Sequence, residues 1–272
     1  MSTPAKDKAF TGSVPQIYDE LLVPMIFTPY AEDLVARLAA GAPRSVLEIA
    51  AGTGAVTRRL ASVLPESTRI VATDLNPPML ERAASIGTVR PVDWRVVDAQ
   101  QLPFADASFD AVACQFGVMF FPDKARAFAE ARRVLRPGGR LLFNVWDRIE
   151  MNEVAHTVMQ ALTLHFAPDP PQFMARTPHG YHERAAIEAD LRSAGFGSTA
   201  AITTITLRGH APSARAAAVA LCQGTPMRHE IEQRGATALE EATEASAAAL
   251  AARFGNEAIN GRIQAIVVEV EA

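Results

Sequence analysis

Short apolar runs alternate with amphipathic segments through the first half of the chain. Apolar runs of this length, between turn residues, are typical of buried strands, and apolar residues three or four positions apart indicate helices. The expected strands are 45–50, 69–75, 93–99, 109–118 and 140–146. The expected helices are 28–40, 55–64, 76–86 and 122–135. Strands that alternate with helices predict an α/β fold with a parallel sheet covered on both faces.

Capping residues support several of these boundaries. Thr28 is a helix cap and Pro29 suits the first turn, as do Asn76 and Pro77 for the helix that follows the second strand. "RPGG" follows the helix 122–135, and its glycines permit the left-handed turn that ends a helix.

The alternation is interrupted twice in the second half of the chain. A helix at 183–196 and strands at 200–209 and 262–270 continue it, whereas 151–182 and the Ala-rich stretch 211–258 do not belong to it. Both insertions follow strands, at the end where open α/β sheets bind ligands, so we expect two helical lids over a substrate. Residues 1–13 are polar, and we expect them to be loosely held.

Composition excludes several classes of protein. The chain has 272 residues, about half of them apolar, and a net charge of −4 without runs of Lys or Arg, which disfavours nucleic acid as a partner. Cys114 and Cys222 lie far apart and suggest neither a disulfide framework nor a zinc site. Without a signal-like or membrane-spanning run, we expect a cytoplasmic protein with no integral membrane association.

The segment "VLEIAAGTGAVTRRL", 46–60, combines features of a nucleotide-binding turn. Gly52 and Gly54 allow backbone N–H groups to approach a ligand closely, because no Cβ intervenes. Asp74 ends the next strand 20 residues after Gly54, the spacing at which an acid reaches a ribose hydroxyl. A nicotinamide fingerprint would have Gly or Ala where the chain has Thr57, and would have no charge in the strand, where the chain has Glu48. A buried carboxylate needs hydrogen-bond donors, which backbone N–H groups of the turn or a ligand ammonium could supply.

Four stretches together resemble a known family. "LEIAAGTG", "ATDLNPPML", "VVDAQQLPFADASFDAV" and "RVLRPGGRLLFNVWD" are similar, in order and spacing, to the motifs of class I S-adenosylmethionine-dependent methyltransferases, type 11-like. The flanking segments resemble a bacterial subgroup of unknown substrate. One departure is that Ala50 stands where the family's first glycine is usual. The resemblance covers roughly 40–147 and implies a Rossmann-like, seven-stranded, mostly parallel sheet with the two lid insertions. It divides the chain into a cofactor-covering helical segment, 1–40, and a methyltransferase domain, 41–272.

The resemblance also assigns cofactor roles by position. The loop of Ala50, Gly52, Thr53 and Gly54 would lie against the methionine part, with Glu48 organising that loop or the ammonium group. Asp74 would accept the ribose hydroxyls. The remaining cofactor contacts would be Leu75 and Met79 beside the adenine, Asp98 and Ala99 at its polar edge, Gln115 and Phe116 on the methionine side, and Tyr18 and Tyr30 from above. By itself, Asp98 could equally cap the following turn, and Tyr18 could be a packing residue.

No catalytic dyad stands out, and methyl transfer does not require one, because alignment of the reactants can supply roughly 7–11 kcal/mol of the barrier. Weak candidates for facing the acceptor are His179, Tyr181, His182, Arg228 and His229, each of which could instead be a surface or packing residue. His179 and His182 alone do not indicate zinc, and no metal is expected.

The sequence therefore predicts an S-adenosylmethionine-dependent methyltransferase that acts on a small-molecule acceptor by in-line displacement. "NPPM" is similar to a motif of nucleic-acid amino-methyltransferases but follows the wrong strand and lacks the final aromatic ring. Two alternatives remain: a module that binds S-adenosylmethionine without transferring the methyl group, and a nicotinamide-dependent oxidoreductase. The sequence indicates neither the acceptor nor the oligomeric state.

Overall fold

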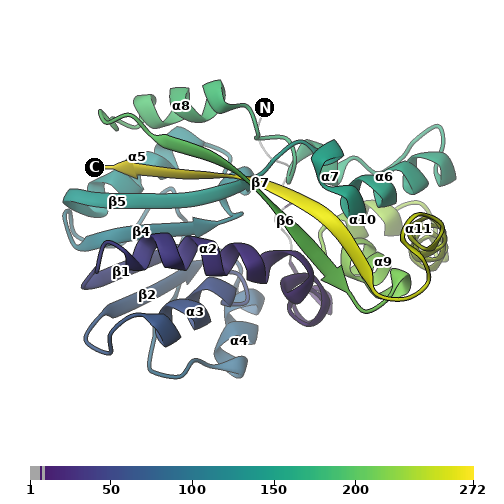
Figure 1. Ribbon diagram of the computed structural model, residues 1–272, viewed down its shortest axis with the longest axis horizontal. Coiled ribbons are helices and arrows are strands. Elements are labelled where there is room, and N and C mark those ends of the chain that lie inside the picture. Colours follow the sequence, from purple (N-terminus) through teal and green to yellow (C-terminus); the bar gives the residue numbers. More distant parts are fainter. Residues whose placement is uncertain (1–6, 8–9) are drawn as a thin grey trace.

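The chain forms one seven-stranded sheet in the order β3-β2-β1-β4-β5-β7-β6 (Figure 1). The computed structural model describes Asp7 and residues 10–272. Strands β1 to β5 pair in parallel, and β7 is antiparallel to both β5 and β6. The predicted Rossmann-like, mostly parallel sheet is confirmed. The strands are β1 (Ser45–Ile49), β2 (Arg69–Asp74), β3 (Asp93–Val96), β4 (Phe109–Gln115), β5 (Leu135–Trp146), β6 (Ala201–Ala211) and β7 (Ile259–Glu271).

Helices cover both faces of this sheet. On one face, α2 packs against α3, and their apolar residues share a core with Val46, Ile70 and Leu142. On the other face, α5 packs against α8, and a second core joins them to residues of β4 and β5. The helices of the sheet are α2 (Thr28–Ala39), α3 (Ala55–Val63), α4 (Pro77–Ile86), α5 (Lys124–Val134) and α8 (Arg184–Ser193).

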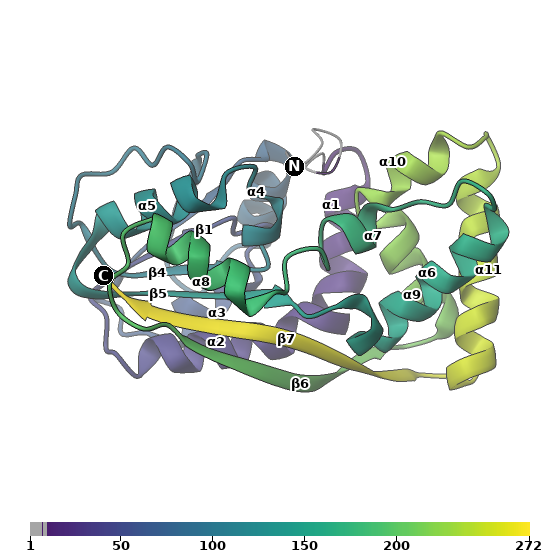
Figure 2. The ribbon, with the colours of Figure 1, turned by 90° about the horizontal axis from the view of Figure 1, so that it is seen from above.

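Apart from two N-terminal helices and the short η3 (Val118–Phe120) after β4, the remaining helices form a separate group beyond one end of the sheet, where the long strands β6 and β7 extend into it (Figure 2). They come from the two predicted insertions, and α11 packs against both α6 and α9. The turn η4 (Ile149–Met151) leads into the first insertion, which contributes α6 (Glu153–His165) and α7 (Phe173–Arg176). The second insertion contributes α9 (Ala214–Gln223), α10 (Met227–Glu232) and α11 (Ala238–Phe254). No described helix combines the length and the apolar character needed to cross a bilayer.

The N-terminal segment passes between the sheet and this helical group (Figure 2). It comprises α1 (Val14–Ile17) and a π-helical stretch, η2 (Tyr18–Phe27), that leads directly into α2. Of the predicted loose segment 1–13, residues 1–6 and 8–9 lie outside the described part. Asp7 is buried, and Arg176 and Thr177 at the end of α7 both donate hydrogen bonds to its carboxylate, so this residue is firmly held.

The predicted end of the helix 122–135 is confirmed to within one residue, but the predicted role of the "RPGG" glycines in ending it is wrong. Helix α5 ends at Val134, and Leu135 is already extended and paired with Phe109 of β4. Gly138 does adopt a positive φ, of 77°, but within the irregular start of β5, where its N–H donates to Ala272. Pairing with the sheet therefore ends the helix before the glycines are reached.

Candidate functional site

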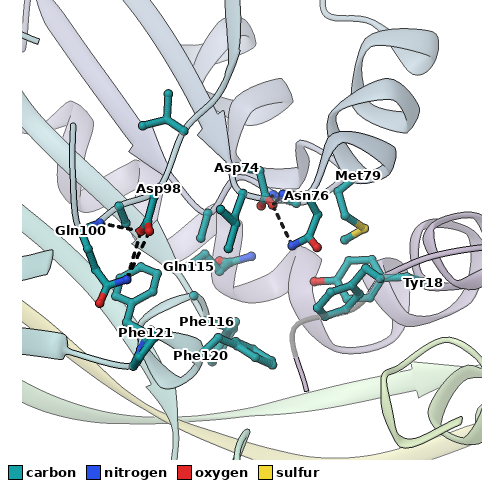
Figure 3. A pocket seen from close by; sticks show the side chains of 18 residues that line it. Tyr18, Asp74, Asn76, Met79, Asp98, Gln100, Gln115, Phe116, Phe120 and Phe121 are labelled. Carbon is teal, nitrogen blue, oxygen red and sulfur yellow. Dashed lines mark hydrogen bonds between the residues drawn. The ribbon is translucent and has the colours of Figure 1, made fainter. Parts of the chain in front are cut away.

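A cavity of about 790 Å³, including its opening, lies where β1, β2 and β4 end (Figure 3). The C-terminal edge of a parallel sheet is where such folds bind ligands. This space is called the main cavity below. Its lining consists of Phe10, Tyr18, Ala50, Gly52, Asp74, Leu75, Asn76, Met79, Val97, Asp98, Ala99, Gln100, Gln115, Phe116, Gly117, Phe120, Phe121 and Pro122.

The loop after β1 bends sharply into α3. Ala50, Gly52 and Gly54 all have positive φ, of 55°, 57° and 84°. The left-handed conformation suits glycine and costs an alanine roughly 1–2 kcal/mol, so Ala50 carries strain at the rim of the cavity. Gly117, after β4, lies so near that an added Cβ would stand 2.4 Å from the Cβ of Ala50. The two loops therefore leave no room between them for a side chain at residue 117.

Asp74 joins the exits of β1 and β2. Its Oδ2 accepts the N–H of Gly52 at 2.8 Å, and its Oδ1 accepts the N–H of Asn76 at 2.8 Å. Asn76 begins α4, but its side-chain amide also donates to Asp74 rather than capping the helix. Burial raises the pKa of Asp74, and these hydrogen bonds oppose that rise. The glycine loop and the acid thus lie together at one cavity.

Glu48 lies fully inside the sheet, paired in register with Ala72 and Ala113. The hydroxyl of Thr57, in the first turn of α3, donates to Glu48 Oε2 at 2.5 Å. Burial raises the pKa of Glu48 to about 8, and the Thr57 hydrogen bond opposes this. Thr57, a mismatch to a nicotinamide fingerprint, is therefore the hydrogen-bond partner that the buried carboxylate requires; backbone N–H groups of the turn do not supply it.

Two unpartnered polar atoms mark a smaller cavity beside Glu48. Thr53 Oγ1 and Gln115 Oε1 are buried without a hydrogen-bond partner, and both residues line this space of about 300 Å³, as do Tyr18 and Gly52. A buried polar atom without a partner is costly, so both are poised to bind a polar group of a ligand. An amino-acid end, with ammonium and carboxylate groups, fits a hydroxyl and an amide oxygen at this place. The residues present therefore fit the methionine part of S-adenosylmethionine, and we call this space the methionine cavity.

The opposite end of the main cavity suits a flat polar ring. Met79 and Ala99 are buried there, whereas Leu75 is 48% exposed. Asp98 accepts the backbone N–H of Gln100 at 2.8 Å and also lines the cavity (Figure 3). Asp98 thus caps the turn, which is one of its two predicted roles, and it also lines the main cavity.

The structure places Tyr30 elsewhere. Its ring is fully buried, and its hydroxyl donates to the carbonyl oxygens of Ile205 and Ile263 on β6 and β7. Because α2 turns Tyr30 toward the antiparallel edge of the sheet, it lines neither the main cavity nor the methionine cavity, and its prediction as a cofactor contact is wrong. Gly54 also lies outside both linings; it supports the loop as the N-cap of α3.

The acceptor-facing candidates lie apart from these cavities. His179 is buried with its Nδ1 2.7 Å from the carbonyl oxygen of Asp147, and burial lowers its pKa to about 4, so the ring is neutral near pH 7. Tyr181 donates to Asp190, and His182 lies against Glu183. Arg228 binds Glu232 and Ser13, and neither it nor His229 lines the main cavity. Among the described residues, no group of three or more His, Cys, Asp or Glu could hold a metal.

A third cavity, of about 450 Å³ including its opening, adjoins the main one and was not anticipated from the sequence. Phe10, Tyr18, Phe116 and Phe120 line both. Its other lining residues are Leu22, Ile26, Phe27, Met119, Trp146, Phe173, Met174, Pro178, Leu221, Thr225 and Pro226. They come from η2, the 3-10 helix η3 (Val118–Phe120) that follows β4, β5 and both insertions, so spacing along the chain does not bring them together. We call this space the side cavity.

Comparison with known proteins shows which chains this one is similar to. Residues 47–143 match the family model described as a methyltransferase domain. A ubiquinone/menaquinone biosynthesis C-methyltransferase of Klebsiella pneumoniae is 30% identical over 169 residues, which cover 57% of this chain and 67% of that protein.

Solved structures show the same fold at lower identity. A Haemonchus contortus phosphoethanolamine N-methyltransferase 2, in complex with S-adenosyl-L-methionine, has a TM-score of 0.55 at 16% identity, covering 95% of this chain and 56% of that one. The [4+2]-cyclase SpnF has a TM-score of 0.54 at 18% identity, covering 90% and 80%. At this identity the likeness concerns the fold, which is shared by proteins of different activity.

Proposed function

The chain belongs to the S-adenosylmethionine-dependent methyltransferase family, and from this premise we propose that it transfers a methyl group to a small-molecule acceptor. The observation that carries the proposal is the arrangement of the cavities. The main cavity lies beside the Asp74–Gly52 contact, and the side cavity adjoins it through four shared residues.

Each end of the main cavity has a role. We propose that Asp74 accepts the ribose hydroxyls, that Asp98, Ala99, Leu75 and Met79 surround the adenine, and that Thr53, Gln115 and Glu48 hold the amino-acid end. Bound S-adenosylmethionine supplies an already activated methyl group. The protein then has to align an acceptor atom and exclude water, which proximity and orientation favour.

The N-terminal segment and the two insertions complete the enclosure in this proposal. Tyr18 and Phe27 of η2 line the side cavity, as do Phe173 of the first insertion and Leu221 of the second. Burial raises the pKa of Tyr18, so its hydroxyl is neutral and can donate a hydrogen bond. We propose that residues 1–40 cover the cofactor and that 151–182 and 211–258 act as lids, with the acceptor held between them.

Calorimetry of S-adenosylmethionine binding tests the cofactor assignment. Hydrogen bonds from hydroxyls to a carboxylate are worth about 1.5–3 kcal/mol each, so we expect Asp74→Asn to weaken binding by about 100-fold. Asp93→Asn is the matched control, because Asp93 begins the neighbouring strand β3 and lines none of these cavities. Equal affinity in Asp74→Asn and the parent would defeat the assignment.

Transfer itself is tested with cofactor labelled in the methyl group. Incorporation of label into a small-molecule extract supports an enzyme. Binding without incorporation into any extract would instead favour a module that holds S-adenosylmethionine without transferring its methyl group. Binding of NAD(H) in preference to S-adenosylhomocysteine would favour an oxidoreductase.

A further inference from the structure

The side cavity is built from aromatic and aliphatic side chains. Seven of its fifteen lining residues are aromatic, and three of the fifteen carry a side-chain oxygen or nitrogen: Tyr18, Trp146 and Thr225. The Thr225 hydroxyl already donates to the carbonyl oxygen of Leu221 at 2.8 Å. Among the described residues, no Asp, Glu, Lys, Arg or His lines this space.

Ring contacts hold this lining together. Phe116 stacks on Trp146 with ring centroids 3.8 Å apart, and Tyr18 stacks on Phe27 at 5.1 Å. Phe10 meets the edge of Tyr18 at 5.9 Å, and lies 6.0 Å from Phe120. One face of each stacked ring is therefore covered by its neighbour, which leaves ring edges and the remaining faces as the surface offered to a ligand.

The three cavities meet at one side chain. Among the described residues, Tyr18 alone lines the main cavity, the methionine cavity and the side cavity. In Figure 3 its hydroxyl points toward the centre of the site, on the side of Gln115. A molecule in the side cavity therefore reaches the junction between the adenosine and methionine ends, which is where an acceptor atom must be placed.

From this geometry we infer that the acceptor is an uncharged molecule with an apolar, ring-bearing body that enters the side cavity; the inference rests on the proposed function. An ionised group moved into such a space loses its hydration and finds no counter-ion, which disfavours its binding. A flat apolar ring instead gains buried area and edge-to-face contacts with the lining. Aromatic ring faces can attract a cation. In the two stacked pairs, however, each ring covers one face of its neighbour, and no carboxylate among the described residues lines the side cavity to bind a cation.

Binding of matched ligands in the presence of saturating S-adenosylhomocysteine tests this. 2-Naphthol presents a hydroxyl on an uncharged ring, 6-hydroxy-2-naphthoate adds a carboxylate at the far end, and 6-(aminomethyl)-2-naphthol adds an ammonium there. Trp146 lines the side cavity, so we expect ligand binding to change its fluorescence. All measurements use the Trp94→Phe variant, in which Trp146 is the only tryptophan. We expect 2-naphthol to bind at least tenfold more tightly than either charged ligand.

Two variants locate the binding. Leu221→Phe fills the side cavity without touching the main one, so we expect it to weaken 2-naphthol binding at least tenfold and to leave S-adenosylhomocysteine affinity unchanged. Ile26→Phe fills the same space from η2, and this variant is used in place of Leu221→Phe if Leu221→Phe does not fold. Leu164→Phe makes the same exchange at a site that is 82% exposed and serves as the control.

The outcomes separate this inference from the proposed function. Equal or tighter binding of a charged ligand, absence of binding by 2-naphthol, or undiminished 2-naphthol binding in a well-folded cavity-filling variant would overturn the inference. The cofactor assignment would survive each of these as long as S-adenosylhomocysteine binds. Loss of S-adenosylhomocysteine binding in the parent would instead remove the proposed function.

Discussion

Replacing Glu48 by glutamine tests the electrostatics at the centre of the site. Glu48 is 1% exposed and accepts one hydrogen bond from Thr57. Burial raises the pKa of Glu48 to about 8, from 4.5 in the unfolded chain. Glutamine keeps an oxygen for the Thr57 hydroxyl but cannot ionise. The pH dependence that Glu48 contributes should therefore disappear in Glu48→Gln.

Proton linkage gives the sign and the size of the change in unfolding free energy with pH. Between the two pKa values the folded state holds a proton on Glu48 that the unfolded state has lost, so the stability from this group is complete below pH 4.5 and is lost as pH rises toward 8. The slope approaches about 1.4 kcal/mol per pH unit. Between about pH 5.5 and about pH 7.5, the free energy of unfolding of the parent should therefore fall by about 2–3 kcal/mol relative to Glu48→Gln.

Urea denaturation at several pH values measures this difference. His179 has the opposite linkage, because burial lowers its pKa to about 4, but it is present in both proteins and its contribution cancels. Glu66→Gln makes the same chemical change on the surface and should track the parent. Equal denaturant slopes for the three proteins would show that the same transition is compared. If the free energies of unfolding of the parent and Glu48→Gln differ by a constant amount, within about 0.5 kcal/mol, across this range, then burial does not raise the pKa of Glu48.

Two further substitutions test the packing around the site. Gly117→Ala places a Cβ 2.4 Å from the Cβ of Ala50 and 2.8 Å from the sulfur of Cys114. We therefore expect the free energy of unfolding to fall by about 1–3 kcal/mol, which is typical of overpacking. We also expect calorimetry to show weaker binding of S-adenosylhomocysteine. Gly197→Ala, which meets nothing within 4 Å, is its control, and equal stability of the two would contradict this account. Arg176→Met leaves the buried carboxylates of Asp7 and Glu230 without the guanidinium that binds both; because Arg176 is itself 35% exposed, we expect a loss of about 2–3 kcal/mol, below the full penalty for a buried pair. Thermal denaturation measures this loss of stability. An unchanged midpoint in Arg176→Met would show that the cluster of Asp7, Arg176 and Glu230 does not hold the N-terminal segment.

Local chemistry was sufficient to predict most of the elements. The apolar runs around Leu47, Val71 and Val112 became adjacent parallel strands because each is bordered by turn residues and followed by an amphipathic helix. The same reasoning placed Gly52 and Asp74 at neighbouring strand ends, and they are hydrogen-bonded to each other. It failed at "RPGG", where pairing with β4 ended the helix before the glycines did.

The sequence by itself determined the alternating fold, the family and the edge of the sheet at which the proposed cofactor site lies, because these depend on periodicity and on residues close along the chain. The tertiary structure decided which distant side chains meet. Thr57 became the partner of Glu48, Tyr30 turned away to β6 and β7, and Tyr18 and Trp146 came to line one cavity. Such meetings follow from helix packing and strand order across the whole domain, and spacing along the chain does not encode them.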